Sequence, residues 1–80
     1  MNVRLKEMIQ EFEMRAGRNG KAQLSIASGL SFYTLKRIEN EGHIPRPQSV
    51  VQLALACGLT EEEAFALARE CSSEKAGVTA

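Results

Sequence analysis

Four polar side chains between residues 33 and 40 recur at the spacing of one helical face, and all of them can donate hydrogen bonds. They are Tyr33, Lys36, Arg37 and Asn40. An α-helix fits the major groove of DNA, where such donors match the acceptors on base edges and the phosphate oxygens. A solvated polar face has the same spacing, so this segment alone leaves both interpretations open.

The sequence offers few residues for metal, thiol or enzymatic chemistry. Its cysteines, Cys57 and Cys71, and its one histidine, His43, form no metal-ligand motif and no disulfide framework. We expect Cys57 to pack as a small hydrophobic residue within the apolar run LALACGL, and Cys71 to be half exposed. No acid–base pair, nucleophile triad or phosphate-binding loop is visible. We therefore expect no enzymatic activity, no metal and no cofactor.

The chain has 80 residues, of which 44% are hydrophobic and 25% charged, as in a single globular domain. It contains no apolar run of about 18 residues that could span a bilayer. Arg4 and Lys6 are not followed by the apolar segment of a signal peptide. Two cysteines without a secretion signal suit a reducing compartment. We expect a cytoplasmic protein that makes no membrane contact.

The formal net charge is zero, which taken alone argues against a nucleic-acid partner. The charges are, however, segregated along the chain. Residues 15–46 carry a net +4, whereas residues 1–14 carry −1 and residues 47–80 carry −3. Because charges act within about one Debye length of 8–10 Å, a positive centre can bind DNA while the acidic flanks face away.

Apolar residues at helical spacing predict five helices and no strand. The expected ranges are 3–16, 21–28, 32–40, 47–57 and 61–71. In the last helix we expect Ala64, Phe65, Ala68 and Cys71 to face inward. The sequence thus predicts a compact all-α domain over residues 1–71, followed by a flexible polar tail, residues 72–80.

Residues between the helices support these ends. Gly29 suits the left-handed conformation that closes a helix, and Ser31 is a good N-cap for the third helix. Pro47 fits the first position of the fourth helix. Thr60 and Glu63 have the spacing of a capping box for the fifth.

Residues 24–40, LSIASGLSFYTLKRIEN, have the pattern of a helix-turn-helix. A small residue, Ser25, lies in the first helix, Gly29 lies in the turn, and apolar residues follow at Leu30, Leu35 and Ile38. With its RIEN ending, this segment resembles the Cro/cI-type helix-turn-helix family of phage and bacterial repressors, over about residues 5–70. The resemblance implies a lambda-repressor-like fold whose second and third helices form the motif. It also implies a transcriptional regulator, a repressor of phage or bacterial type, that inserts its third helix into the major groove of operator DNA.

The same resemblance implies roles for individual residues. Base reading falls to Phe32, Tyr33, Lys36 and Arg37. Contacts to the DNA backbone fall to Lys21, Ser31, Thr34, Asn40 and Arg46. Glu39 corresponds to a structural carboxylate of the family that pairs with an arginine of the first helix, for which Arg15 is the candidate. Phe32 and Tyr33 are bulky where the family is usually polar, and either can touch a thymine methyl group.

Several alternatives remain at this point. Phe32 either faces the DNA or folds back onto Leu35 in the core. Val51, Leu55 and Leu67 lie off the main inward stripes, so they either seal the core or form the two-fold contact of a homodimer on DNA. The alternative function is a protein–protein interaction module that has the same fold and does not bind DNA. No ligand domain follows the helices, so we expect no small-molecule effector.

Overall fold

The computed structural model describes the backbone of residues 3–79 and the side chains of residues 3–73. Five helices make up most of this part of the chain: α1 (Val3–Ala16), α2 (Gly20–Ser28), α3 (Phe32–Glu41), α4 (Pro47–Ala56) and α5 (Glu61–Thr79). Residues 3–79 contain no strand. The prediction of a compact all-α domain with five helices is confirmed.

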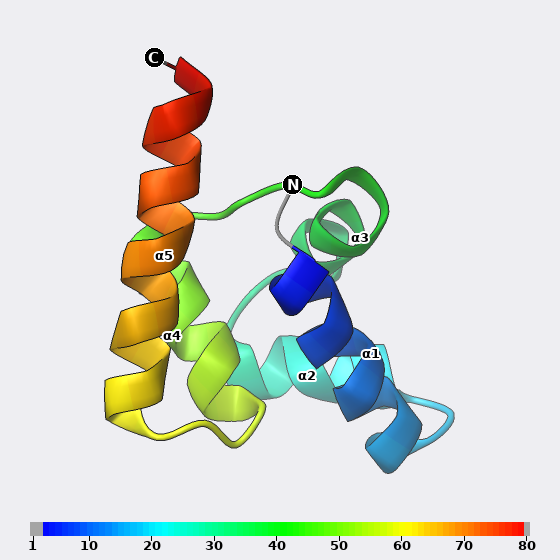
Figure 1. Ribbon diagram of the computed structural model, residues 1–80. Coiled ribbons are helices and arrows are strands. Elements are labelled where there is room, and N and C mark those ends of the chain that lie inside the picture. Colours follow the sequence, from blue (N-terminus) through cyan, green and yellow to red (C-terminus); the bar gives the residue numbers. More distant parts are fainter. Residues whose placement is uncertain (1–2, 80) are drawn as a thin grey trace.

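Helix α2 lies at the centre of the arrangement. It packs against α1, α3 and α4, while α1 also contacts α3, and α4 packs along α5 (Figure 1). All five helices contribute to one hydrophobic core. Its largest fully buried side chains are Leu5, Ile9, Leu24, Leu35, Ile38, Val50, Leu53, Leu67 and Cys71. In Figure 1 the helices α3 and α5 lie on opposite sides of the molecule, which leaves the outer face of α3 clear of α5.

The predicted helix ends are mostly confirmed, because they depend on local caps. The Ser31 hydroxyl accepts a hydrogen bond from the Thr34 N–H at 3.1 Å, as an N-cap does. Gly29 closes α2 with a φ of 77°, a left-handed conformation that favours glycine. Helix α5 differs from the prediction, since it continues past Cys71 to Thr79. Residues 72–79, predicted as a flexible tail, contain polar residues but no proline, and polarity alone does not end a helix.

The inward face of α5 also differs from the prediction. Phe65 is 51% exposed, whereas Leu67 is only 1% exposed and belongs to the core. The buried stripe runs through Ala64, Leu67, Ala68 and Cys71, at i, i+3, i+4 and i+7. Phe65 follows Ala64 by about 100° around the helix, which turns its ring outward. Cys71, expected to be half exposed, is buried because it lies on this stripe.

Cys57 packs in the core as predicted. Burial raises the pKa of its thiol to about 11, although the nearby Arg15 opposes this shift. At neutral pH this thiol therefore stays protonated, as expected of a structural cysteine and not of a nucleophile.

The capping box at the start of α5 forms as predicted. The Thr60 N–H donates to Glu63 Oε1 at 3.0 Å, and the Glu63 N–H donates to Thr60 Oγ1 at 3.1 Å. These hydrogen bonds with Thr60 lower the pKa of Glu63 below its ordinary value of 4.5. The contribution of the Glu63 carboxylate to stability is therefore present above pH 4.5 and is lost as the pH falls through the lower pKa of the folded state.

We expect Glu63→Gln to lower the melting temperature near pH 7 and to have little effect near pH 3. The amide keeps a hydrogen-bond acceptor but loses the negative charge that favours the start of a helix. Thermal unfolding followed by circular dichroism at both pH values checks this. Glu62→Gln, one residue earlier and outside the capping box, is the matched control and should give a smaller change. An equal effect of Glu63→Gln at both pH values contradicts the assignment.

Candidate nucleic-acid interface

Two serines fix the connection between α2 and α3. The Ser25 hydroxyl donates to the Leu30 carbonyl oxygen at 2.5 Å. The buried Ser28 hydroxyl donates to the Leu24 carbonyl oxygen at 2.7 Å and accepts from the Leu30 N–H at 3.2 Å. The pattern predicted a small residue at Ser25, but neither its hydrogen bond nor those of Ser28. Their hydrogen bonds hold the start of α3 in a fixed position relative to α2.

Helix α3 separates an apolar inner face from an exposed outer face. Leu35 and Ile38 are buried in the core. The predicted base-reading residues lie outside it: Phe32 is 48% exposed, Tyr33 is 65% exposed, Lys36 is exposed and the Arg37 side chain is 40% exposed. Of the two alternatives left open for Phe32, the structure shows the outward one, since the ring does not fold back into the core. Its place at the first residue of α3, before the inward turn that contains Leu35, keeps the ring at the surface.

The exposed side chains of α3 interact in pairs. The Lys36 ammonium lies 5.9 Å from the centroid of the Phe32 ring, and the Arg37 guanidinium lies 6.0 Å from the centroid of the Tyr33 ring. Both distances suit cation–π attraction. Arg37 Nε also lies 3.7 Å from Glu41 Oε1, one turn along the helix. These contacts align two cations and two aromatic rings along one outer face of the helix.

The residues predicted to contact the DNA backbone differ in how exposed they are. Asn40 and Arg46 are exposed, and Ser31 is also exposed at the start of α3. The Thr34 and Ser31 hydroxyl oxygens lie 2.9 Å apart, so both are near the N-terminus of α3, where anions are favoured. These four residues remain accessible to phosphate groups.

Lys21 has partners that the sequence analysis did not predict. Its ammonium lies 3.4 Å from Glu39 Oε1 and 3.6 Å from Glu13 Oε1, and its side chain is only 19% exposed. The same ammonium lies 5.7 Å from the centroid of the Phe32 ring. Lys21 is therefore a largely buried cation that links α1, α2 and α3 in the free protein, while the phosphate contact expected for it stays a prediction.

The predicted ion pair between Arg15 and Glu39 is wrong. Arg15 Nη2 instead donates to the Cys57 carbonyl oxygen at 3.4 Å, on the side of α1 that faces the end of α4. Glu39 takes Lys21 as its partner, and Glu13 is the carboxylate that α1 contributes. Sequence reasoning missed Glu13 because nothing local marks which side of α1 meets α2 at that level.

The cluster of Glu13, Lys21 and Glu39 holds two carboxylates for one ammonium. One oxygen of each carboxylate, Glu13 Oε1 and Glu39 Oε2, is buried without a hydrogen-bond partner. Burial raises the pKa of Glu13, and the neighbouring Glu39 carboxylate raises it further. An ion cluster of this kind contributes more to the defined position of the helices than to net stability, because removing the charges from water offsets their attraction.

Close packing explains how Glu13 comes to lie beside α2. A Cβ atom added to Gly20 would lie 2.6 Å from the Glu13 Cα and 3.1 Å from its carbonyl oxygen. Only glycine therefore fits at the start of α2 without displacing α1. The range expected for the second helix, 21–28, begins one residue after Gly20, so this requirement was not predicted.

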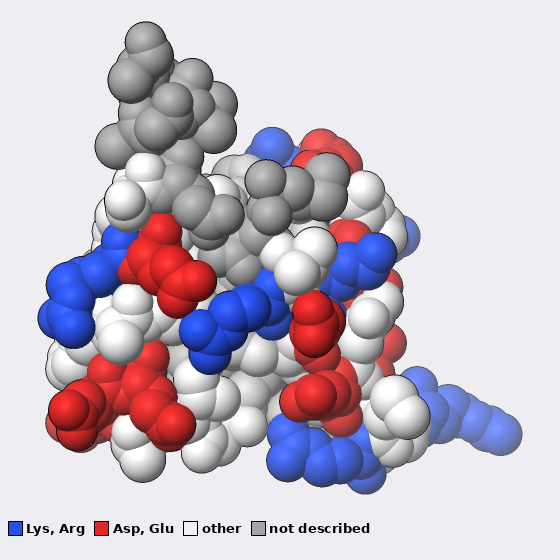
Figure 2. Space-filling view, viewed as in Figure 1, with Lys and Arg blue, Asp and Glu red and all other residues white. Residues whose placement is uncertain are grey.

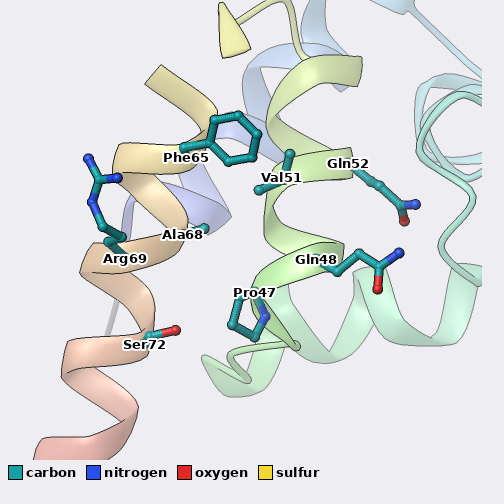
Figure 3. A pocket seen from close by; sticks show the side chains of 8 residues that line it. All are labelled: Pro47, Gln48, Val51, Gln52, Phe65, Ala68, Arg69 and Ser72. Carbon is teal, nitrogen blue, oxygen red and sulfur yellow. The ribbon is translucent and has the colours of Figure 1, made fainter. Parts of the chain in front are cut away.

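The predicted dimer residues divide between the core and the surface. Leu67 is buried and cannot reach a second copy, Val51 is half-buried, and Leu55 is exposed. An apolar groove of about 590 Å³ runs between α4 and α5. In Figure 3 Val51 and Phe65 face each other across this groove, which Pro47 closes at one end. Of the two alternatives left open for Leu67, the structure shows the core position, and Phe65 is the exposed apolar residue of this part of α5.

Figure 2 shows both signs of charge side by side over much of this face of the molecule, with a group of one sign at two places. Acidic side chains cover the start of α5, where Glu61, Glu62 and Glu63 are exposed. Cationic side chains extend near the end of α1 and the connection to α2, where Arg15 and Arg18 are exposed. The acidic end of α5 lies away from α3.

Comparisons of the chain with protein-family models, with curated proteins and with solved structures found no match. Among the residues that the structure describes, no group of three or more His, Cys, Asp or Glu side chains is placed to hold a metal ion. None of the described helices has the length and apolar character needed to cross a membrane.

Proposed function

We propose that this protein binds double-stranded DNA in a sequence-specific manner and regulates transcription, as a repressor of phage or bacterial type. The observation that carries the proposal is the outer face of α3, which presents Tyr33, Lys36 and Arg37 on a helix held rigidly against α2. In this role α2 and α3 act as a helix-turn-helix, and α3 enters the major groove. The resemblance of residues 24–40 to the Cro/cI-type family supports the same function.

The chemistry of this face suits DNA better than a purely solvated surface. Arg37 carries the planar donor set that matches the O6 and N7 acceptors of guanine, and Lys36 can reach the same acceptors or a phosphate. Ser31, Thr34, Asn40 and Arg46 surround these residues with donors suited to phosphate oxygens. The first turn of α3 also exposes two adjacent aromatic side chains, Phe32 and Tyr33, which is more apolar surface than a helix that only faces water usually presents.

Selection of bound duplexes from a random DNA pool tests the proposal directly. The selected duplex should bind far more tightly than random DNA, and its affinity should fall steeply with salt. Each phosphate contact contributes a slope of about 0.9 in a plot of log affinity against log salt concentration. The control is a scrambled duplex of equal length. No enrichment, or an affinity that does not respond to salt, contradicts DNA binding and favours a protein–protein interaction module.

Glu41→Gln is expected to raise DNA affinity about two- to fivefold. Glu41 lies 3.7 Å from Arg37, so in the free protein it competes with DNA for the guanidinium, and its charge also repels phosphates. Fluorescence anisotropy with the selected duplex at low salt measures the change. Glu70→Gln removes an equal charge from α5 and pairs with Arg4, so it should have a smaller effect. An unchanged or lower affinity for Glu41→Gln contradicts this role of the ion pair.

The proposal includes a homodimer on DNA, as the family resemblance implies. The groove between α4 and α5 has an exposed apolar wall at Phe65, and a two-fold contact could place the same ring of a second copy in it. Two recognition helices would then need to lie about 34 Å apart to enter successive major grooves. Sedimentation with and without a two-fold symmetric duplex tests this, with Phe65→Ser as the variant that should dissociate the dimer. A single copy bound per symmetric duplex contradicts it.

A further inference from the structure

Phe32 is unusual among the outward side chains of α3, because it has no hydrogen-bonding group. Its ring lies at the first residue of the helix, with about half of its surface exposed. The neighbouring outward side chains are polar or cationic. Burying this apolar surface against a partner is therefore favourable, at about 25 cal/mol per Å².

Two cations hold the Phe32 ring in place from different elements. The Lys36 ammonium lies over the ring from the next turn of α3, at 5.9 Å from the centroid. The Lys21 ammonium lies over it from α2, at 5.7 Å. Lys21 is itself held by Glu39 at 3.4 Å and Glu13 at 3.6 Å. The ring is thus restrained before any partner arrives, which reduces the entropy lost when it binds.

The chemistry of the major groove limits what such a ring can recognise. Base edges there present hydrogen-bond donors and acceptors, and the single apolar group is the C5-methyl of thymine. A phenyl ring cannot satisfy the donors and acceptors, so contact with them is unfavourable. The same methyl group occurs on 5-methylcytosine, which makes the recognised chemistry a 5-methylpyrimidine.

We propose that Phe32 is a specificity-determining residue that reads the 5-methyl group of a pyrimidine in the major groove, and that Lys21 is a positioning residue for its ring. This inference rests on the proposed function. In this arrangement the first turn of α3 contacts a thymine base. Lys21 then contributes by holding the Phe32 ring and does not contact a phosphate directly. Glu13 and Glu39 do not contact the ring in this arrangement, and they hold the Lys21 ammonium in place.

The test uses the full chain and the duplex selected from the random pool. Each thymine is replaced in turn by deoxyuridine, which removes only the methyl group and keeps the base pair. One position per half-site should lose affinity about fourfold, the factor that corresponds to about 0.8 kcal/mol for one buried methyl group. Placing 5-methylcytosine opposite guanine at that position should bind more tightly than cytosine there by a similar factor.

Variants of the chain show whether Phe32 is responsible. Phe32→Ala should reduce the thymine-to-uracil affinity ratio at that position to about one, while Tyr33→Ala keeps the ratio. Lys21→Met should shrink the ratio, and Lys21→Arg should restore it, which a purely structural role would not predict. Circular dichroism checks that each variant is folded. The result for Phe32→Ala can be interpreted even if the Lys21 variants do not fold.

The possible failures are distinguishable. If no duplex is enriched, the proposed function and this inference are both overturned. If duplexes are enriched but no thymine responds to loss of its methyl group, only this inference is overturned. A thymine-to-uracil ratio that persists in Phe32→Ala has the same consequence, because another residue then reads the methyl group.

Discussion

Arg37→Ala is expected to lower the affinity for the selected duplex roughly 5- to 150-fold. An arginine that contacts guanine through both O6 and N7 contributes about 1–3 kcal/mol of discrimination. Arg37 is available for this contact because its side chain is 40% exposed and points away from the core. In the free protein it lies near the Tyr33 ring and the Glu41 carboxylate, both on its own helix.

Arg37→Lys separates charge from geometry at this position. Lysine keeps the positive charge but lacks the planar pair of donors that matches guanine. The variant should therefore retain the salt dependence of binding and lose most of the preference for the selected duplex over a scrambled one. Arg4→Ala, which removes a cation paired with Glu70 of α5, controls for a general loss of charge. Undiminished affinity of Arg37→Ala for the selected duplex contradicts base reading by this residue.

Gly20→Ala is expected to destabilise the fold by about 1–2 kcal/mol. The new Cβ would lie 2.6 Å from the Cα of Glu13, and backbone atoms cannot move aside as a flexible side chain can. Overpacking of this kind costs about 1–3 kcal/mol, while the better helix propensity of alanine recovers less than about 1 kcal/mol. For a domain of this size the melting temperature should fall by about 5–15 °C.

Thermal unfolding followed by circular dichroism measures this change. Gln23→Ala serves as the matched control, because it alters an exposed position of the same helix and should stay within about 0.5 kcal/mol. DNA affinity provides a second readout for Gly20→Ala, since a displaced α1 also displaces Glu13 and with it Lys21. A melting temperature equal to that of the native chain contradicts the close packing of α1 on α2.

Features fixed by neighbours in sequence were predictable for this chain. The N-cap at Ser31, the left-handed Gly29 and the capping box of Thr60 with Glu63 all depend on residues three or fewer apart. The outward position of Lys36 and Arg37 followed from the helical period set by Leu35 and Ile38. These predictions needed no knowledge of which helices meet.

Features that depend on how helices meet were not predictable in the same way. One of the four inward residues expected in α5 was wrong, because Phe65 is exposed and Leu67, which packs in the core, is buried in its place. Lys21 contributes to the net positive charge of residues 15–46, yet it lies beside Glu13, which belongs to the preceding segment of net negative charge. Charge summed along a sequence window omits such partners.

Because both cysteines are buried, their reactivity reports on local opening of the fold. A thiol reagent reacts with the exposed thiolate, so Cys57 and Cys71 become reactive only when the surrounding helices separate. Cys71 lies on α5, and Cys57 lies at the end of α4. The labelling rate at each thiol therefore measures how often the helices around it separate, without the introduction of a new cysteine.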